Sequence, residues 1–341
     1  MNVRTPRFYP DHINYLLNRG IAQDGNFDVL ATDAGAYKMG TFTTGSEAEL
    51  FDMKPLNKCT FDTSADTDGH VMITIDTQGG YKKSFVAILN HNMESADAKV
   101  LIKASDTESH ITAVDMGSAS SLSSPVEVLN ADTIASSIIT PATDGSTIVR
   151  FTEQTQRYWG IQFEGDSSNT FGSTDLFVGC ILIGEYYEMP HAPDLNVKRS
   201  ISFENMSKVQ QSVGGQRYSN LSNHGRQASS TTLSPFSTGT SDLYPYGGRI
   251  IYDMNFSFLN STDVMPTEYE IDLAAYDSVI DDIWHKTHGS HTPFIFSIDK
   301  DSEGADAESE HIFARFGQSS LDMTQVANDI WNISMRIEEE F

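Results

Sequence analysis

The chain has 341 residues, of which 47 are acidic and 22 are basic, so its formal net charge is −25 at pH 7. Because phosphate backbones are bound through basic patches, this charge argues against a nucleic-acid partner. A hydrophobic content of 39% is typical of a globular chain, and the length allows two domains with a core each. No apolar run approaches the roughly 18 residues that span a bilayer, and the opening MNVRTPRFYP lacks the apolar core of a signal peptide. We therefore expect a soluble protein made in a cytoplasm, with no membrane partner.

The first 54 residues alternate short aromatic or aliphatic clusters with Gly, Asn and Asp. This pattern predicts an extended N-terminal arm over 1–54 that is not an element of a compact fold. We expect such an arm to lie across a neighbouring subunit, with Phe8, Tyr9 and Tyr15 in the interface.

Residues 55–188 contain short apolar segments separated by Gly- and Asp-rich turns, without an amphipathic helix between them. Many short strands at this spacing predict an antiparallel β-sandwich or jelly roll. Trp159 and Phe163 fall on one side of their strand, so both should anchor its core. The expected strands are His70–Asp76, Lys83–Leu89, Ala98–Ala104, Ser146–Thr152, Tyr158–Phe163 and Leu176–Tyr187.

The two cysteines, Cys59 and Cys180, lie far apart and beside apolar neighbours. Two cysteines in a chain of this length are not a disulfide scaffold, so we favour two buried free thiols. The alternative is one disulfide that joins the first and last strands of this domain.

Pro190 and Pro193 should end the sheet and begin a linker over 189–195, because proline cannot donate to a strand ladder. The second domain, 196–341, combines alternating strands with a Ser/Thr-rich stretch over 219–246 that is too polar to pack alone. We expect this stretch to be a flexible loop or an arm ordered against a neighbouring subunit. Tyr186 and Tyr187, and Tyr244 and Tyr246 of this stretch, are further candidate interface residues.

One helix is expected in the second domain, over 267–288. Thr267 and Glu270 form a capping box, apolar residues recur at helical spacing, and Gly289 is a suitable stop. Strands surround this helix, and the whole chain is therefore predicted to be mainly β, with two β-sandwich domains.

Several phrases of the chain resemble known phage families. FVAILNHNM (Phe85–Met93), AKVLIKASD, RYWGIQF and DLFVGCILIGEY resemble the galactose-binding-like jelly rolls of bacteriophage structural proteins, over roughly residues 55–188. The pieces RIIYDMNFSFLN, TPFIFSID, RFGQSSL and IWNISMRIEEE, in that order, resemble the distal tail or baseplate proteins of tailed phages over most of 189–341. The resemblance implies a small β-sandwich that forms a ring at the tail end.

The candidate metal sites are weak. Asp299, Asp301, Glu303 and Glu310, with Gly304, have the spacing of a calcium loop, although an acidic hairpin loop is the favoured interpretation. Asp62, Asp66 and Asp68, in the turn at 62–69, are a second candidate calcium site, and a solvated turn is the favoured interpretation there as well. His285, His288 and His291 have the spacing of zinc ligands, but a surface position near a helix end is favoured.

No constellation of residues indicates catalysis. We therefore expect a non-enzymatic virion structural protein of a tailed phage, in the tail tip, baseplate or tail adaptor. Its partners would be further copies of itself, in a ring or trimer, and other tail proteins. We expect no cofactor, and structural Ca²⁺ is the alternative that the acidic loop leaves open. The alternative is a carbohydrate-binding module that recognises host-surface glycans, and a glycan-degrading enzyme is the third option.

Overall fold

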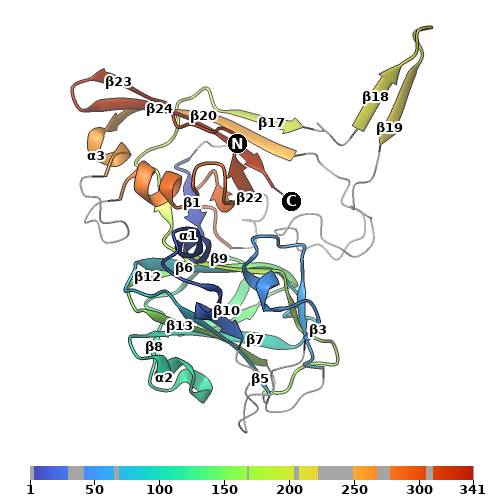
Figure 1. Cartoon of the computed structure of the whole chain (residues 1–341), viewed down its shortest axis with the longest axis vertical. Coiled ribbons are helices and arrows are strands. Elements are labelled where there is room, and N and C mark those ends of the chain that lie inside the picture. Colours follow the sequence, from blue (N-terminus) through green and yellow to red (C-terminus); the bar gives the residue numbers. More distant parts are fainter. Residues whose placement is uncertain are drawn as a thin grey trace.

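The computed structural model describes residues 4–29, 42–64, 69–166, 169–202, 207–221, 249–266, 277–304 and 310–340. Strands make up 47% of the described residues and helical residues 12%, and the paired strands run antiparallel. The predicted mainly β class is therefore confirmed. Two β units lie one above the other, and a separate hairpin stands away from both (Figure 1).

The first unit is a sandwich of two sheets. One sheet has the order β10-β11-β7-β13-β5-β2 with β8 beside β7, and the other has the order β15-β6-β12-β9. The strands of the larger sheet are β2 (Phe27–Val29), β5 (His70–Asp76), β7 (Ala98–Ser105), β8 (Ser120–Ser121), β10 (Ala131–Ala135), β11 (Ile138–Pro141) and β13 (Tyr158–Gly165). Those of the smaller sheet are β6 (Lys83–His91), β9 (Val126–Leu129), β12 (Gly145–Gln154) and β15 (Cys180–Gly184). A small third sheet joins β3 (Phe42–Thr44), β4 (Cys59–Phe61) and β14 (Phe177–Val178).

The core of this sandwich follows the alternation of its strands. Trp159, Ile161 and Phe163 of β13 are fully buried in it, as the period of two predicts. The indole of Trp159 donates to the carbonyl of Gln156 at 2.9 Å, so its one polar group is satisfied. Both cysteines are buried free thiols, which confirms the favoured interpretation.

The smaller sheet is buried on both faces. Val86 and Ile88 of β6 face the sandwich core, whereas Phe85, Ala87 and Leu89 face the second unit. This burial explains why FVAIL is a continuous apolar run instead of an alternating one. In β15, Ile181 and Ile183 likewise face the sandwich core, and Cys180 and Leu182 face the second unit.

The second unit is built on one sheet with the order β16-β1-β21-β22-β24-β20-β17, and β23 pairs with β24. Its strands are β1 (Arg7–Pro10), β16 (Tyr187–Glu188), β17 (Lys198–Ser202), β20 (Arg249–Asn260), β21 (Phe294–Ser297), β22 (His311–Phe316), β23 (Met323–Ala327) and β24 (Ile330–Glu339). The short helix α3 (Ser261–Val264) and the π-helix η4 (Ile280–His285) accompany it. The predicted helix lies outside the described residues over 267–276, and its described end contains η4. Residues 222–248, most of the Ser/Thr-rich stretch, also lie outside the described part.

The prediction of an extended arm over 1–54 is wrong. Strand β1 lies between β16 and β21 of the second sheet, so the first strand of the chain completes the last unit. The helix α1 (His12–Asn18) and the short η2 (Glu47–Phe51) then cover the core of the first unit. The short helices η1 (Asp24–Asn26), α2 (Glu108–Ile111) and η3 (Val114–Met116) also belong to the first unit. The arm looked unpackable because its partners are distant in sequence.

The two units share a buried apolar interface, which we call the seam core. Tyr9, Ile295 and Phe313 of the second sheet pack there against the outer face of the smaller sheet. Because consecutive side chains of a strand point to opposite faces, Phe8 of β1 enters the core of the second unit while Tyr9 enters the seam core. The segment 189–195 is therefore not the only connection between the units. None of the helices among the described residues is long and apolar enough to cross a membrane.

Candidate assembly surface

The aromatic residues predicted to meet a neighbouring subunit are instead buried inside the chain. Phe8, Tyr9 and Tyr15 are at most 1% exposed, and Tyr187 is 4% exposed. Tyr186 is partly buried at the seam core, with the guanidinium of Arg7 5.1 Å from its ring centre. The side chains that the sequence placed at an intersubunit surface thus form intramolecular contacts. Tyr244 and Tyr246 lie outside the described residues.

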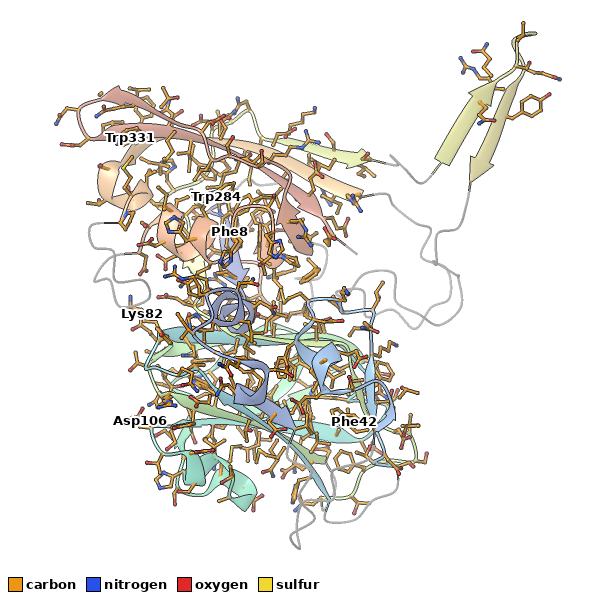
Figure 2. All side chains as sticks on the ribbon, viewed as in Figure 1. Phe8, Phe42, Lys82, Asp106, Trp284 and Trp331 are labelled. Carbon is orange, nitrogen blue, oxygen red and sulfur yellow. The ribbon has the colours of Figure 1, made fainter. Side chains whose placement is uncertain are left out.

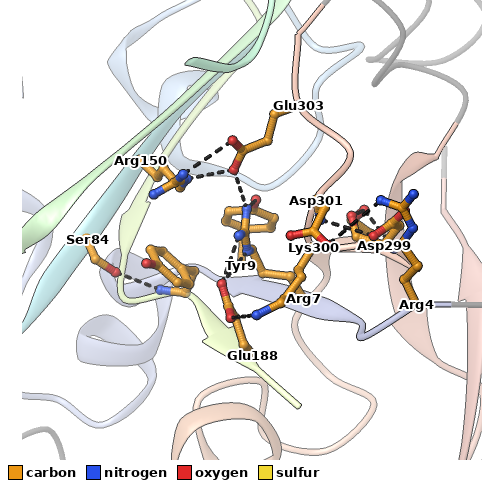
Figure 3. Close-up of polar contacts among 12 residues, drawn as sticks. Arg4, Arg7, Tyr9, Ser84, Arg150, Glu188, Asp299, Lys300, Asp301 and Glu303 are labelled. Atoms are coloured by element: carbon orange, nitrogen blue, oxygen red, sulfur yellow. Dashed lines mark hydrogen bonds and ion pairs between the residues drawn. The ribbon is translucent and has the colours of Figure 1, made fainter. Parts of the chain in front are cut away.

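The acidic loop that has the spacing of a calcium site is held by arginines (Figure 3). Glu303 accepts from Arg150 Nε at 2.6 Å and from Arg7 Nη1 at 3.0 Å. Asp299 pairs with Arg4 Nε at 3.2 Å, and Asp301 lies 3.8 Å from Arg4 Nη1. Within the described residues, Asp299, Asp301, Glu303 and Glu310 do not form a group with metal-ligand spacing. The loop therefore joins the two units through ion pairs, because β1 and β12 present cations to it.

Burial strengthens this network. Arg7 is 4% exposed, and it also donates to Glu188 Oε1 at 2.8 Å and to the hydroxyl of Tyr9 at 3.1 Å. Burial alone would raise the pKa of Glu303, but the hydrogen bonds from Arg150 and Arg7 lower it below its usual value. Burial raises the pKa of Tyr9 to about 12, against the opposing effect of Arg7. The network keeps Glu303 ionised and Tyr9 neutral at pH 7.

One His/Asp/Glu group among the described residues has the spacing of metal ligands. His70, Asp115 and Glu164 bring their ligand atoms within 4.8 Å of one another on the outer face of the larger sheet. The amide nitrogen of Gln162 lies 3.2 Å from His70 Nδ1, from Asp115 Oδ1 and from Glu164 Oε2. Lys99 Nζ adds a positive charge 3.4 Å from Glu164 Oε1. The amide nitrogen thus already lies between the three ligand atoms where an ion would bind, and the ammonium pairs with one of the two carboxylates.

The three histidines of the predicted H-x-x-H-x-x-H motif are exposed. His285 pairs with Asp281, with 3.0 Å between Nδ1 and Oδ1, and His288 packs its ring against Tyr15. Within the described residues they form no metal-ligand group with other His, Cys, Asp or Glu side chains. The interpretation as surface histidines therefore fits the structure better than a zinc site.

The surface best suited to a protein partner lies on the second unit and on the hairpin beside it. The hairpin joins β18 (Ser207–Gln211) to β19 (Arg217–Leu221), and Gly215 at φ +87° closes its turn. The hairpin stands clear of both units (Figure 2). The exposed large apolar side chains of this part of the chain are Leu195, Ile201, Val213, Tyr218, Phe258 and Val326.

The same region is basic, unlike the chain as a whole. Between 196 and 221 the sequence has four basic residues and one acidic residue, a net charge of +3 in a chain of −25. Strand β17 in this segment is the last strand of its sheet, so one row of its backbone groups has no strand partner in the described sheet. Ile201 on this strand is 58% exposed. A basic, partly apolar strand edge is well suited to meet an acidic surface.

The projecting hairpin was not predicted from the sequence. The available signals were the local reversal of charge and the exposed apolar residues at the turn. The seam core had a clearer signal, because the unbroken runs FVAIL and CILI indicate strands that are covered on both faces.

No protein-family model matches the chain, and no curated protein does. Among solved structures, the chain is similar to chitosan-binding module 1 derived from a chitosanase/glucanase of Paenibacillus sp. IK-5. The two share 14% identity, the match covers 43% of this chain and 96% of the module, and the TM-score is 0.28. At this TM-score we infer nothing about the chain from the likeness.

Proposed function

We propose that the chain is a non-enzymatic virion structural protein of a tailed phage that acts by homo-oligomeric assembly at the tail tip, baseplate or tail adaptor. The phage context comes from the resemblance of its sequence phrases to tail proteins. The assembly is supported above all by the β18–β19 hairpin, which packs on neither unit.

A two-stranded hairpin alone is marginally stable in water, so this one needs a surface to dock on. Among its described side chains, the exposed apolar residues Val213 and Tyr218 are the groups that docking would bury. A second copy of the chain offers a strongly acidic surface, and the hairpin region is basic. Opposite charges steer such an encounter and set its orientation.

The edge strand β17 provides a second contact of the same kind. An exposed edge can accept a strand from a neighbour through main-chain hydrogen bonds. Lys198 and Arg199 on this edge oppose unspecific strand pairing, because charged residues protect edge strands. An acidic neighbouring copy would neutralise these two charges and so allow the pairing. In a ring or trimer, each copy would use its hairpin and edge on the next.

The experiment measures the mass of the purified chain by light scattering after gel filtration, from about 1 to 200 μM and at low and high salt. We expect oligomers that weaken as salt rises, because the charges are screened. The double variant Val213→Asp/Tyr218→Asp should be monomeric. In the matched control, Leu56→Asp/Val126→Asp, exposed apolar residues of the first unit are changed, and assembly should persist. A monomeric wild-type chain throughout this range, or hairpin variants that assemble normally, would refute the proposal.

A further inference from the structure

A surface pocket of about 440 Å³ lies where α1 meets the turn that follows η4. Trp284, His285, His288 and Ser290 line it from the second unit, Arg19 lines it from the end of α1, and Ser319 from the β22–β23 connection. This volume is within the range of pockets that hold small ligands. Its lining combines one aromatic ring, three nitrogen-bearing side chains that can carry positive charge and two hydroxyls.

The lining concentrates positive charge in an acidic protein. No carboxylate among the described residues pairs with Arg19, whose contacts are the ring of Tyr15 at 5.6 Å and its hydroxyl at 3.4 Å. In contrast, Arg7, Arg150 and Arg157 each hold a carboxylate.

The pKa of His288 is lowered from its usual value, first by partial burial and then by the positive charges of His291, Arg19 and His285. A bound anion would relieve this repulsion.

Three acidic groups of the second unit, on η4 and near the end of β24, are paired with other cations. Asp281 holds His285, and Glu340 holds Arg315 with 3.1 Å between Oε2 and Nε. Asp282 turns to Lys286 in the buried contact with the first unit. None of these carboxylates pairs with Arg19, so its guanidinium is available to an anion, whereas Asp281 offsets the charge of a protonated His285.

The walls are held in place by contacts from both units. Arg315 Nη1 donates to the carbonyls of Ser290 and His291, and Asn18 Nδ2 donates to Thr292 Oγ1 at 3.4 Å. Gly289 has φ +65°, and a Cβ there would lie 3.2 Å from the Trp284 ring. The turn can therefore pack closely against the indole, which also contacts Phe316 at 5.1 Å between ring centres. Such a fixed arrangement lowers the entropic cost of binding.

We propose that this pocket binds a small acidic sugar, with its carboxylate on Arg19 and its ring against Trp284. Arginine matches a carboxylate through paired N–H donors, and an indole face suits the apolar face of a sugar ring. Ser290 and Ser319 supply hydrogen-bonding groups for the sugar hydroxyls. This binding goes beyond assembly, and it would link a tail protein to acidic surface glycans.

Calorimetric titration of the full chain with D-galacturonate, D-galactose and acetate tests the proposal. Galactose lacks the carboxylate, and removal of a charge-assisted contact costs about tenfold in affinity. Acetate keeps the carboxylate but lacks the sugar ring that would pack on Trp284. Each should therefore bind at least about tenfold more weakly than galacturonate. Arg19→Gln should weaken galacturonate binding by a similar factor, while Arg217→Gln, an exposed arginine of the hairpin, should leave it unchanged. In the variant Trp331→Phe the remaining tryptophans are Trp159, which is fully buried, and Trp284, which lines the pocket. A ligand in the pocket should therefore quench the fluorescence of Trp284 in this variant.

Affinity for galacturonate should rise as the pH falls from 8 to 6, because a bound anion favours protonated His288. His288→Gln should flatten this dependence while the fold, checked by thermal unfolding, is retained. Equal binding of galactose and galacturonate, full binding by Arg19→Gln, acetate as strong as the sugar acid, or no binding of any probe would each overturn the proposal. None of these measurements depends on the oligomeric state.

Discussion

Glu303 ties the two units by charge, and Glu303→Ala tests that tie. Its carboxylate joins the loop after β21 to Arg7 of β1 and to Arg150 of β12. The substitution leaves Arg150 without its carboxylate and reduces Arg7 to its contacts with Glu188 and Tyr9. The loss should therefore weaken the junction between the units while both cores stay intact.

The burial of the partners sets the expected magnitude. Breaking a fully buried ion pair costs about 3–5 kcal/mol, whereas an exposed pair contributes about 0–1 kcal/mol. The side chains of Arg7, Glu303 and Arg150 are 5%, 24% and 30% exposed, which is between these limits. We expect Glu303→Ala to lower the free energy of unfolding by about 2–3 kcal/mol.

Urea unfolding at pH 7 measures this change. The matched control is Glu153→Ala, since Glu153 is 46% exposed and its oxygen lies 3.8 Å from Lys82 Nζ; this variant should lose less than about 1 kcal/mol. A double-mutant cycle with Arg150→Ala should give a coupling energy of at least about 0.5 kcal/mol.

The same assay separates the arginine clamp from a calcium loop. A site with a Kd of about 10 μM would stabilise the fold by about 2.7 kcal/mol in 1 mM Ca²⁺. We expect equal stability in Ca²⁺ and in EDTA, because Arg7 and Arg150 already occupy the Glu303 carboxylate. A Glu303→Ala variant as stable as wild type, or a Ca²⁺ gain of that size that Glu303→Ala abolishes, would refute this reasoning.

Three more predictions concern the interior. Phe85→Ala removes a ring whose centre lies 5.1 Å from that of Tyr9, and it should lower the free energy of unfolding in urea by about 3–4 kcal/mol. Ile201→Ala, at an exposed position, should lower it by less than about 0.5 kcal/mol. Similar losses for the two variants would contradict a buried apolar seam core. Burial raises the pKa of Asp11 to about 6, so its stabilising contribution is complete below about pH 4 and about 3 kcal/mol is lost as the pH rises through 6. Asp11→Asn should flatten the curve of unfolding free energy against pH, and an unchanged curve would count against this assignment. Cys59 and Cys180 are buried with raised pKa values, so a thiol reagent should label neither before urea unfolds the chain; rapid labelling of the native protein would disprove this.

The sequence by itself determined the local structure of the first unit. Alternation placed Trp159 and Phe163 in the sandwich core, turn residues separated the strands, and the apolar surroundings of the cysteines indicated free buried thiols. These features depend on neighbours along one strand, so the period of two is enough to predict them. The end of the jelly roll was not predicted in this way, because β16 (Tyr187–Glu188), which precedes the prolines, already pairs with β1 in the sheet of the second unit.

Only the tertiary structure decided where the first strand and the acidic loop belong. Arg7 and Glu303 are 296 residues apart, and β1 pairs with a strand almost as distant. A short strand such as RFYP carries no signal for its partner, because pairing depends on which edge the folded sheet leaves open. The spacing of the acidic loop resembled a calcium site, since spacing alone does not show that arginines from two other strands reach the same carboxylates. The pocket and the projecting hairpin arise in the same way, from segments that meet or separate only after the two cores have formed.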